Sequence, residues 1–347
     1  MNKLLPFLLI LVLLGSGCTV PVLNIQIPGL PDIPGFGGPT VVQYEHDMVV
    51  ITSLEAIPAE VDAGQTVRLL AYIENRGDTT IPDVVVDLYD YCQGLFEPKV
   101  TTCTGTKDAS KPMCTISKLL PKQTLPVAWT LAQKGPPVKL KTICPPDGMK
   151  VSVTYPYATS SLTTITLIGK DELDRTLEER TFKSTESYIV LGPGPIKPMI
   201  TVDDKQPIPV FKDARTVLAF QISNKGSGRL ASTVNEPIPP GSPTGTTQQT
   251  HVGIVKGDVT ITGIGPAAGN LKPITGPDEL CFVENSNNLK EDVRLIGKDS
   301  SKMLCKIDLS GLEDEVTKTA SKHVEAKVSY KYSFTKSVMV TVNPKIV

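Results

Sequence analysis

The feature that most limits how this chain can fold is its internal repetition. The octet KDASKPMC at residues 107–114 returns as KDSSKMLC at residues 298–305. Upstream of each octet, YIENRG at residues 72–77 matches QISNKG at residues 221–226. Both hexapeptides run from an alternating strand pattern into an Asn-basic-Gly turn. The two halves of the chain therefore share more than one local motif.

A third echo involves two pairs of tyrosines near the end of each half. Tyr155 and Tyr157 in VSVTYPY match Tyr330 and Tyr332 in KVSYKY. Three echoes in the same order predict one domain that occurs twice, because self-similarity within a chain is typical of a repeated structural unit. A chain of 347 residues is also long enough for two domains of about 150 residues each.

Alternation of apolar and polar residues predicts that each copy is a β-sandwich. Residues 65–77 place every second side chain on one face of an extended strand. The apolar side chains on that face are Val67, Leu69, Ala71 and Ile73. The same period recurs at residues 83–91, 125–132, 151–157, 218–222 and 328–342. Only 5% of the residues are aromatic, whereas Pro and Gly number 30 and 27, which is typical of short strands joined by turns.

Two segments depart from this period. In residues 169–180, GKDELDRTLEER, Leu173 and Leu177 lie one helical turn apart among charged residues. That spacing predicts one short amphipathic helix. Residues 235–250 are rich in Pro, Gly, Ser and Thr, so we expect them to form a surface loop inserted into the second copy.

The first residues have the form of an export signal. Lys3 is followed by an apolar run from Leu4 to Leu14 and then by small residues up to Cys18. The run is shorter than the roughly 20 residues that a membrane-spanning helix needs, so it predicts a signal peptide. The segment LGSGC resembles the lipobox of bacterial and archaeal lipoproteins, in which the cysteine carries a lipid. A lipobox usually has Leu three places before the cysteine, where this chain has Gly15, so ordinary secretion is the alternative to a lipid on Cys18.

The cysteine count favours an exported protein. The chain has seven cysteines, and when Cys18 is set aside an even number is left in each half. Even numbers are expected of disulfides in an oxidising compartment. The second half has only Cys281 and Cys305, so neither has another partner there. We therefore expect them to bond with each other.

The first half has four cysteines, which allow three connectivities. Cys114 ends the first octet as Cys305 ends the second. The spacing from Cys92 to Cys114 is the nearest match to the spacing from Cys281 to Cys305, whereas Cys103 stands much closer to Cys114. This match predicts that Cys92 bonds with Cys114. By elimination, Cys103 is expected to bond with Cys144.

Stretches rich in Pro and Gly mark the joints of the chain. Neither a helix nor a sheet can continue through residues 19–41, because Pro lacks a backbone donor and Gly favours the unfolded chain. The segment LGPGPIKP marks the boundary between the two halves. The expected segments are a signal peptide at 1–18, a tether at 19–41, a first β-sandwich domain at 42–190, a linker at 191–198 and a second β-sandwich domain at 199–347.

Residues 58–90 resemble a known family of surface domains. The stretch PAEVDAGQTVRLLAYIENRGDTTIPDVVVDLYD combines the motif AGQTV, an alternating strand, an Asn-basic-Gly turn and a second apolar strand. This order is similar to the adhesion-related CARDB domains of bacterial and archaeal surface proteins, and a weaker similarity covers residues 216–230. The resemblance implies two tandem immunoglobulin-like β-sandwiches on a cell surface. The family has no catalytic residues that could be assigned to positions of this chain.

Charge and motifs argue against several functions. Lys and Arg total 35 against 36 for Asp and Glu, so the chain lacks the basic field that nucleic acid requires. The sequence contains no Cys-x-x-Cys pair, no HExxH, no GxxxxGK[ST], no GxSxG and no calcium-binding loop. We therefore expect no enzyme activity, no cofactor and no nucleic-acid partner.

Candidate metal ligands are scattered along the chain. His46, His251 and His323 have no cysteine or carboxylate at ligand spacing, so we expect surface side chains. Acidic residues cluster at 203–204 and at 313–315. Calcium needs about six to eight oxygen ligands, so these clusters are expected to be solvated loops and not a metal site.

The tyrosine pairs allow two interpretations. A Tyr-x-Tyr motif places both rings on one face of a strand, either as a ligand platform or as part of the core. Its occurrence in both halves favours the core, because a duplicated domain needs its core twice and a binding surface only once.

Together these features predict a non-enzymatic surface protein at the extracellular face of the cell membrane. The lipid on Cys18 would hold it there, and loops or edge strands would contact an unknown protein or glycan of the cell envelope. The alternative is a structural subunit of a filament or coat. In that case LNIQIP, at residues 23–28 of the tether, would add a strand to the sheet of a neighbouring copy.

Overall fold

The computed structural model describes most of the chain after the tether. The described residues are 40–43, 46–108, 110–134, 140–143, 145–231, 233–234, 251–254, 259–264, 270–274, 281, 289 and 292–344. Residues Pro39–Val347 form one compact unit. The predicted signal peptide, Cys18, residues 19–39 of the predicted tether and Cys144 lie outside the described residues.

The described elements are almost all strands. Those of the first half are β1 (Thr40–Gln43), β2 (Val49–Ile57), β3 (Glu60–Val61), β4 (Val67–Asn75), β5 (Ile81–Asp90), β6 (Phe96–Thr102), β7 (Thr106–Lys107), β8 (Met113–Leu119), β9 (Thr124–Gln133), β10 (Thr142–Ile143), β11 (Met149–Gly169) and β12 (Tyr188–Leu191). Those of the second half are β13 (Ile196–Val202), β14 (Ile208–Val210), β15 (Arg215–Asn224), β16 (Arg229–Leu230), β17 (Thr233–Val234), β18 (His251–Ile254), β19 (Val259–Thr262), β20 (Lys272–Pro273), β21 (Val293–Ile296), β22 (Asp299–Ser300), β23 (Met303–Asp308), β24 (Thr319–Val338) and β25 (Thr341–Val342). The described helices are α2 (Lys170–Glu178) and the short 3-10 helix η2 (Ser310–Leu312).

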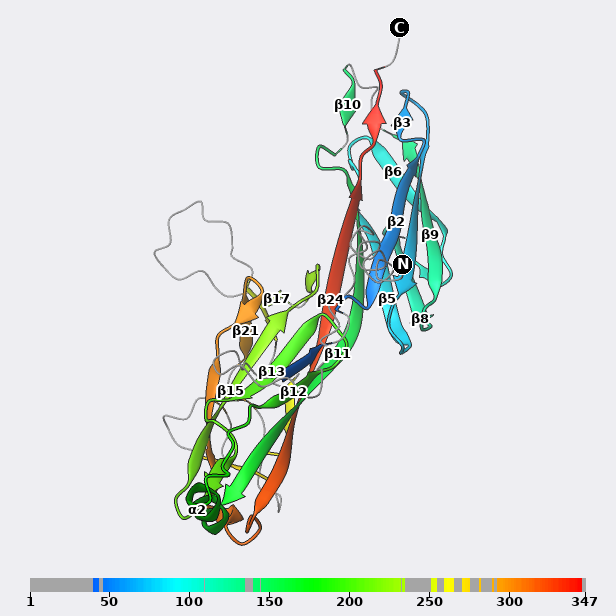
Figure 1. Cartoon of the computed structure of the whole chain (residues 1–347). Helices are drawn as coiled ribbons and strands as arrows, with labels where there is room; N and C mark the ends of the chain where they lie inside the picture. The colour runs from blue at the N-terminus through cyan, green and yellow to red at the C-terminus, as the bar shows by residue number, and fades with distance from the viewer. Residues whose placement is uncertain are drawn as a thin grey trace, which may run out of the picture. The chain divides into compact units, whose positions relative to one another are not determined.

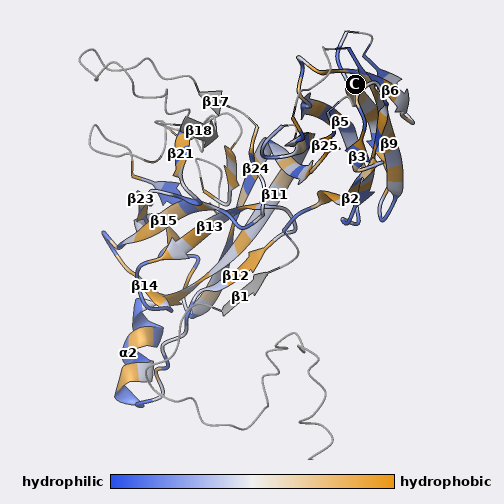
Figure 2. Cartoon of the chain, turned by 90° about the horizontal axis from the view of Figure 1, so that it is seen from above, coloured by the Kyte–Doolittle hydropathy of each residue, from blue (hydrophilic) through white to orange (hydrophobic). Residues whose placement is uncertain are grey.

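The first repeat contains two sheets whose buried faces belong to one hydrophobic cluster. One sheet has the strand order β2–β4–β9–β6, and the other joins β7, β8 and β5 to the first part of β11. The buried apolar side chains of β4 and β5 are Val67, Leu69, Ala71, Ile73, Ile81, Val84, Val86 and Leu88. Figure 2 shows the resulting stripes of hydrophobic and hydrophilic residues along the strands. The predicted period of two is therefore confirmed, in an arrangement consistent with a β-sandwich.

The second repeat has a related arrangement. β15 pairs with β13 on one side and with β23 on the other, as β4 pairs with β2 and β9. A second sheet joins β24 to β16 and β19. A small separate sheet with the order β10–β25–β3 connects the end of the chain to the first repeat. The chain is thus mainly antiparallel β structure, as the sequence predicts.

Two long strands belong to both repeats. β11 and β24 pair antiparallel from Met149, opposite Val338, to Ile168, opposite Thr319, and lie side by side in Figure 1. β11 pairs with β5 of the first repeat near its start and with β12 and β14 near its end. The repeats therefore share one sheet of ten described strands and one continuous hydrophobic core. Such sharing joins the expected tandem domains much more closely than a linker would.

Local twofold symmetry relates the repeats at this ladder. The tyrosine echo makes Tyr155 equivalent to Tyr330, so the next residues, Pro156 and Lys331, are equivalent as well. Pro156 and Lys331 face each other across the ladder. When a twofold axis passes between two copies of the same strand, each residue near the axis lies opposite its own equivalent. The same geometry is found where two identical subunits meet through identical surfaces.

The echoed tyrosines lie around this axis. The ladder sets Tyr155 opposite Tyr332 and Tyr157 opposite Tyr330. Neighbouring ring centroids are 6.0 to 6.4 Å apart, and three of the four ring pairs meet edge to face. Tyr155, Tyr330 and Tyr332 are buried. Core packing, and not an exposed ligand platform, is therefore the confirmed interpretation.

The Asn-basic-Gly turns are also equivalent. The Asn75 Oδ1 atom accepts the N–H of Gly77 at 2.9 Å, and Asn224 Oδ1 accepts the N–H of Gly226 at 3.1 Å. Each asparagine side chain closes the turn that follows its strand, β4 in the first repeat and β15 in the second. The turn echo thus identifies β4 and β15 as equivalent strands.

The joints of the chain are part of the sheets. The boundary expected at residues 191–198 contains the end of β12 and the start of β13, and residues 194–198 are buried. Thr40 and Val41, at the end of the predicted tether, belong to β1, which pairs in parallel with β12. The helix predicted at residues 169–180 is confirmed as α2. Among the helices of the described residues, none has the length and apolar character needed to cross a membrane.

Candidate functional site

The first octet borders a cleft of about 590 Å³ in the first repeat. The residues that line it are Tyr91, Gln93, Phe96, Glu97, Pro98, Lys99, Val100, Lys107, Asp108, Ser110, Lys111, Pro112 and Lys134. They come from the β5–β6 connection, from β6, from the β7–β8 hairpin and from the end of β9. We call this hollow the octet cleft. Its volume falls within the range of about 300–1,000 Å³ that is typical of small-ligand sites.

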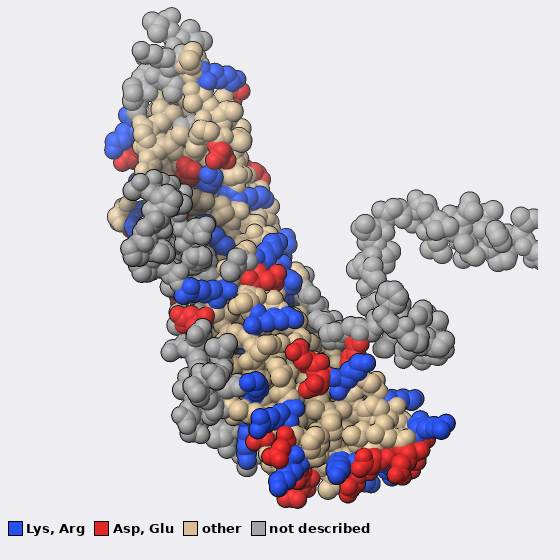
Figure 3. All heavy atoms as spheres, turned by 90° about the vertical axis from the view of Figure 1, so that its left-hand side faces the viewer, with Lys and Arg blue, Asp and Glu red and all other residues tan. Residues whose placement is uncertain are grey.

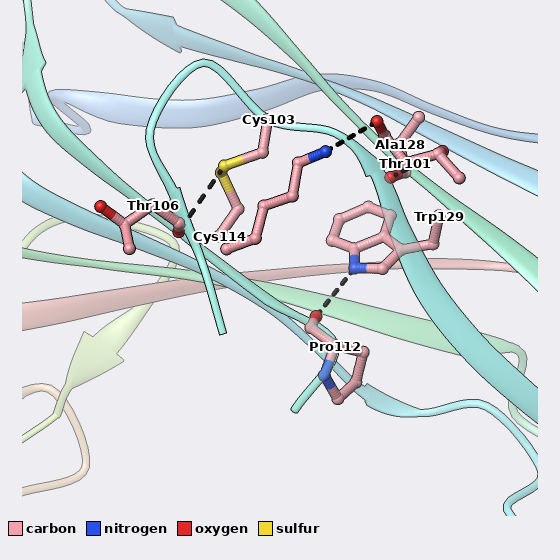
Figure 4. The surroundings of a disulfide bond; sticks show 8 residues. Thr101, Cys103, Thr106, Pro112, Cys114, Ala128 and Trp129 are labelled. Carbon is pink, nitrogen blue, oxygen red and sulfur yellow. Dashed lines mark hydrogen bonds between the residues drawn. A yellow bond between two sulfur atoms is a disulfide. The ribbon is translucent and has the colours of Figure 1, made fainter. Parts of the chain in front are cut away.

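A disulfide and a tryptophan hold the hairpin that forms one wall of the octet cleft. Cys103 and Cys114 are bonded, with their Cα atoms 5.9 Å apart (Figure 4). Lys107 lies opposite Cys114 in the β7–β8 pairing. The buried Trp129 donates a hydrogen bond from Nε1 to the carbonyl oxygen of Pro112 at 2.8 Å. The hairpin is therefore fixed by a covalent bond on one side and by the core of the repeat on the other.

Four lysines converge on the octet cleft: Lys99, Lys107, Lys111 and Lys134. The ammonium of Lys107 donates to the carbonyl oxygen of Thr101 at 3.0 Å. That of Lys134 lies 3.6 Å from the carboxylate of Glu97, and both side chains are largely exposed. Within the described part of the chain, the ammonium groups of Lys99 and Lys111 form neither an ion pair nor a hydrogen bond. Two cationic groups are therefore left for a ligand.

The carboxylates of the octet cleft are mostly occupied by the protein itself. Glu97 faces Lys134, while Asp108 Oδ1 accepts hydrogen bonds from both the N–H and the hydroxyl of Ser110 at 2.7 Å. The bonds from Ser110 hold the pKa of Asp108 below its usual value. Nearby, burial raises the pKa of Asp87, and the positive charge of Lys111 offsets part of that effect. Four ammonium groups against two lining carboxylates leave a local charge of +2 (four minus two).

The second octet lies at a different place in its repeat. Cys114 faces Val86 on β5, whereas Cys305 faces Leu218 on β15. Since β15 is equivalent to β4, the two octets end on strands that are not equivalent. Cys114 and Cys305 therefore do not occupy equivalent positions, although the predicted disulfide pairing assumed that they do. The similarity of the octets lies in local sequence, a polar turn before a strand.

A backbone contact gives the true correspondence. The N–H of Asn75 donates to the carbonyl oxygen of Gln123 at 2.9 Å, and the N–H of Asn224 donates to that of Lys298 at 2.6 Å. Lys298, the first residue of the second octet, therefore corresponds to Gln123 at the start of β9 and not to Lys107. The octet echo misplaces β23, whereas the turn echo and the tyrosine echo agree with the fold.

The predicted disulfides are only partly present. The bonds between described residues are Cys103–Cys114 and Cys281–Cys305. The second confirms the prediction, but the first contradicts the predicted pairing of Cys92 with Cys114 and of Cys103 with Cys144. The β7–β8 hairpin brings Cys103 beside Cys114, and spacing along the chain does not determine proximity in a sheet. Cys92 is itself disulfide-bonded.

A second hollow of about 750 Å³ lies beside α2. Its lining consists of Gly169, Lys170, Asp171, Leu173, Asp174, Val210, Phe211, Lys212, Glu313, Val316 and Thr317. Two lysines face three carboxylates there, so the charges are nearly balanced. This hollow is larger than the octet cleft, but it has no marked preference for ligands of one charge.

The acidic clusters and histidines do not assemble a metal site within the described residues, where no three His, Cys, Asp or Glu side chains come together. Asp204 accepts a hydrogen bond from the hydroxyl of Thr216 at 2.7 Å, and Glu315 forms an ion pair with Lys322 at 3.0 Å. The exposed His323 lies 3.1 Å from the Thr164 hydroxyl.

The other two histidines lie apart from these groups. His46 is partly buried, and its burial lowers its pKa, with a further lowering from the charge of Lys197. It is thus not the fully solvated side chain that the sequence predicts. His251 belongs to β18.

Comparisons with known proteins do not identify this site. No protein-family model matches the sequence, and no curated protein matches it significantly. The resemblance to CARDB domains, and the immunoglobulin-like topology that it implies, therefore stay predictions. Function must be argued from the fold and from the octet cleft.

Sequence reasoning found only part of this cleft. Lys107 and Lys111 stand in the octet, which the sequence marks as a repeated segment. Lys99 and Lys134 have no distinguishing pattern in the sequence. They reach the cleft because β6 and β9 pair with Phe96 opposite Gln133, a contact between distant segments.

Proposed function

We propose that this protein is a non-enzymatic surface protein that is tethered to the membrane through Cys18 and contacts another component of the cell envelope. The observation that supports this function best is the octet cleft. A disulfide-held hairpin forms one of its walls, and the ammonium groups of Lys99 and Lys111 form no ion pair or hydrogen bond with any described residue. A site with fixed walls and cationic groups is suited to binding. The sequence motifs of known nucleophile, base or metal chemistry are not present to suggest catalysis.

The disulfides bear on where the protein works. Two bonds, Cys103–Cys114 and Cys281–Cys305, are present in the described residues. Disulfides persist in oxidising compartments and are rare in the cytoplasm, so they indicate an extracytoplasmic location for the compact unit. Together with the predicted signal peptide and the lipobox-like segment before Cys18, they support a place on the extracellular face of the membrane.

The shared core supports a role as a stiff support for the site. A flexible linker lets two domains move independently, whereas the β11–β24 ladder and a continuous core hold both repeats in one body. In this proposal the repeats are immunoglobulin-like sandwiches, fused through their long strands. The tether would place them away from the membrane, at a distance of up to about 3 Å per residue if extended.

The alternative is assembly into a filament or coat by strand addition. One observation favours it: β1, next to the predicted tether, pairs in parallel with β12 at an edge of the shared sheet. A segment of a neighbouring copy would have to take a similar edge position. The proposed donor, LNIQIP at residues 23–28, lies outside the described residues. Size-exclusion chromatography with light scattering, with and without residues 19–43, decides between assembly and a monomer.

Analysis of the native N-terminus tests the proposed tether. We expect mass spectrometry to find Cys18 as the first residue with a lipid mass attached, and cell fractionation to find the protein with membranes. A single acyl chain binds membranes only marginally, at about 10⁴ M⁻¹, so two chains or a second contact are expected. The variant Cys18→Ser should leave the membrane fraction. An unmodified residue at or after Cys18 would contradict the proposal.

A further inference from the structure

We propose that the octet cleft binds an acidic polysaccharide, through uronic-acid carboxylates or sulfate esters carried on its sugars. This inference rests on the proposed surface function and adds the class of ligand. The chain as a whole has a net charge of −1, and Figure 3 shows basic and acidic side chains interspersed over one face. The octet cleft differs from this average, because its lining carries four lysines and two carboxylates.

The cationic groups of the cleft are available to a ligand. Lys99 and Lys111 have no bond through their ammonium groups within the described residues. Lys107 uses one donor on Thr101, and an ammonium has three donors in all. The lysines extend from β6, from β7 and from the hairpin loop, so they surround the cleft and do not form one compact cluster. Separated cations suit an anion that repeats along a polymer.

The remainder of the lining suits sugar rings. Pro98 on β6 and the ring of Tyr91 supply apolar surface, and the exposed Gln93 supplies an amide, whereas Phe96 and Val100 are buried in the core. Tyrosine presents both an apolar ring face and a polar hydroxyl. A pyranose ring offers C–H groups to the first and hydroxyl groups to the second. A protein partner would bury about 800 Å² of this chain's surface, an area much broader than one cleft. A cleft of this size therefore suits a chain of a few sugars better.

The cleft is held in shape before a ligand binds. The Cys103–Cys114 bond, the Trp129 hydrogen bond to Pro112 and the Asp108 contacts with Ser110 all restrain the hairpin. Binding to a fixed site loses less conformational entropy than binding that must order a loop. Modest charge interactions can therefore give measurable affinity.

The second octet provides a matched control. Its KDSSK segment repeats the lysines of KDASK as Lys298 and Lys302, and both are exposed. It lies beside β15, at a position equivalent to the start of β9 and not to the β7–β8 hairpin. Lys298 and Lys302 thus match Lys107 and Lys111 in sequence but lie in different surroundings. If the cleft is the site, only the lysines of the first octet and its neighbours affect binding.

The test uses the oxidised mature chain from residue 18, with Cys18→Ser, and isothermal titration calorimetry. The probes are a hexamer of galacturonic acid, a sulfated oligosaccharide, the neutral maltohexaose and a poly-glutamate peptide. We expect at least one acidic saccharide to bind and maltohexaose not to bind. The stronger acidic probe identifies the anionic group. Raising the salt concentration from about 20 to about 200 mM should weaken binding several-fold, because exposed charges are screened.

Three double variants locate the site. Lys99→Ala with Lys111→Ala should weaken binding about tenfold, since each exposed charge pair is worth up to a factor of about five. Lys99→Arg with Lys111→Arg should retain most of the affinity. The control, Lys298→Ala with Lys302→Ala, should bind within about twofold of the parent chain. Circular dichroism and thermal unfolding confirm that each variant is folded.

Three results would overturn the inference: no acidic saccharide binds, the poly-glutamate peptide binds as tightly as the saccharide, or the control variant weakens binding as much as the cleft variant. The tether is tested separately. Lipid on Cys18 without saccharide binding would refute the cleft ligand alone. Saccharide binding by a chain that is not lipidated in cells would refute the tether alone.

Discussion

The four-tyrosine cluster allows a sharp test of hydrogen bonding in the core, because symmetry provides a matched pair. Tyr155 and Tyr330 occupy equivalent positions in the two repeats, and both are buried. The Tyr330 hydroxyl lies 2.6 Å from the hydroxyl of Thr159 and accepts the N–H of Ile196 at 3.4 Å. The Tyr155 hydroxyl is buried and has no hydrogen-bond partner among the residues that the structure describes. The N–H groups near it, those of Met48 and Val49, do not reach hydrogen-bond geometry.

Replacement of each tyrosine by phenylalanine should therefore have opposite effects. Tyr330→Phe removes a bonded hydroxyl and leaves the buried Thr159 without its partner, which should lower the free energy of unfolding by about 2 kcal/mol. Tyr155→Phe removes a polar atom that is desolvated without compensation, so stability should stay unchanged or rise by up to about 1 kcal/mol. Both rings stay in place, so packing changes little.

Equilibrium unfolding in guanidinium chloride measures the difference. Trp129, the single tryptophan of the chain, reports on the first repeat by fluorescence, and circular dichroism reports on all strands. For a unit of this size, 1 kcal/mol corresponds to about 2 °C in the unfolding temperature, so the two variants should differ by about 4 to 6 °C. Coincident transitions of both probes are also expected, because the repeats share one core.

The outcome that refutes this reasoning is an equal loss of stability in both variants. It would mean that the Tyr155 hydroxyl has a partner comparable to Thr159. Tyr332→Phe serves as a further reference, because its hydroxyl donates to Asn224 Oδ1 at 3.0 Å. That variant should lose about 1 kcal/mol, since Asn224 Oδ1 keeps the N–H of Gly226.

Three further predictions concern the disulfide, the turn and pH. Non-reducing peptide mapping should find Cys103 linked to Cys114, and a Cys92–Cys114 peptide would contradict this. Cys103→Ala with Cys114→Ala should lower the free energy of unfolding by about 3 kcal/mol, because the bond reduces the conformational entropy of the unfolded chain. Asn75→Ala should lower the free energy of unfolding, measured with denaturant, by about 3 kcal/mol. The reason is that the Asn75 amide donates to the carbonyl oxygens of Thr79, Leu119 and Leu120 at 2.8 to 3.1 Å. A loss below about 1 kcal/mol would show that water replaces these bonds. Burial raises the pKa of Tyr155, Tyr330 and Tyr332 above the usual value of 10.0. The free energy of unfolding should therefore be unaffected by these groups below about pH 10 and should fall as the pH rises above it, because the unfolded chain loses these protons first. Unfolding midpoints that stay constant from about pH 9 to 11 would argue against their burial.

Much of the fold could be predicted because the deciding patterns are local. A period of two in residues 65–77 reflects one buried face, and that face is the one that β4 buries. Leu173 and Leu177 predict α2 for the same reason. The duplication was also visible, since Asn75 and Asn224, and the paired tyrosines, occupy positions that the fold relates by symmetry.

The octet echo shows the limit of such patterns. KDASKPMC and KDSSKMLC are nearly the same, yet the first includes the start of β8 beside β5 and the second includes the start of β23 beside β15. A polar turn before a strand is compatible with many places in a sheet, so similarity over one short segment does not determine which strand becomes the neighbour. The disulfide prediction depended on that similarity and was wrong for Cys114.

The sequence by itself determined which segments are strands, which faces they bury and that one unit occurs twice, because each of these properties follows from neighbouring residues along the chain. Only the tertiary structure decided that β11 and β24 pair with each other and so serve both repeats. It also decided that Cys103 lies beside Cys114, and that Lys99 and Lys134 meet the first octet at one cleft. These outcomes depend on strand neighbours and on register, which are fixed when distant segments pack around a common core and are not encoded in any short stretch of the chain.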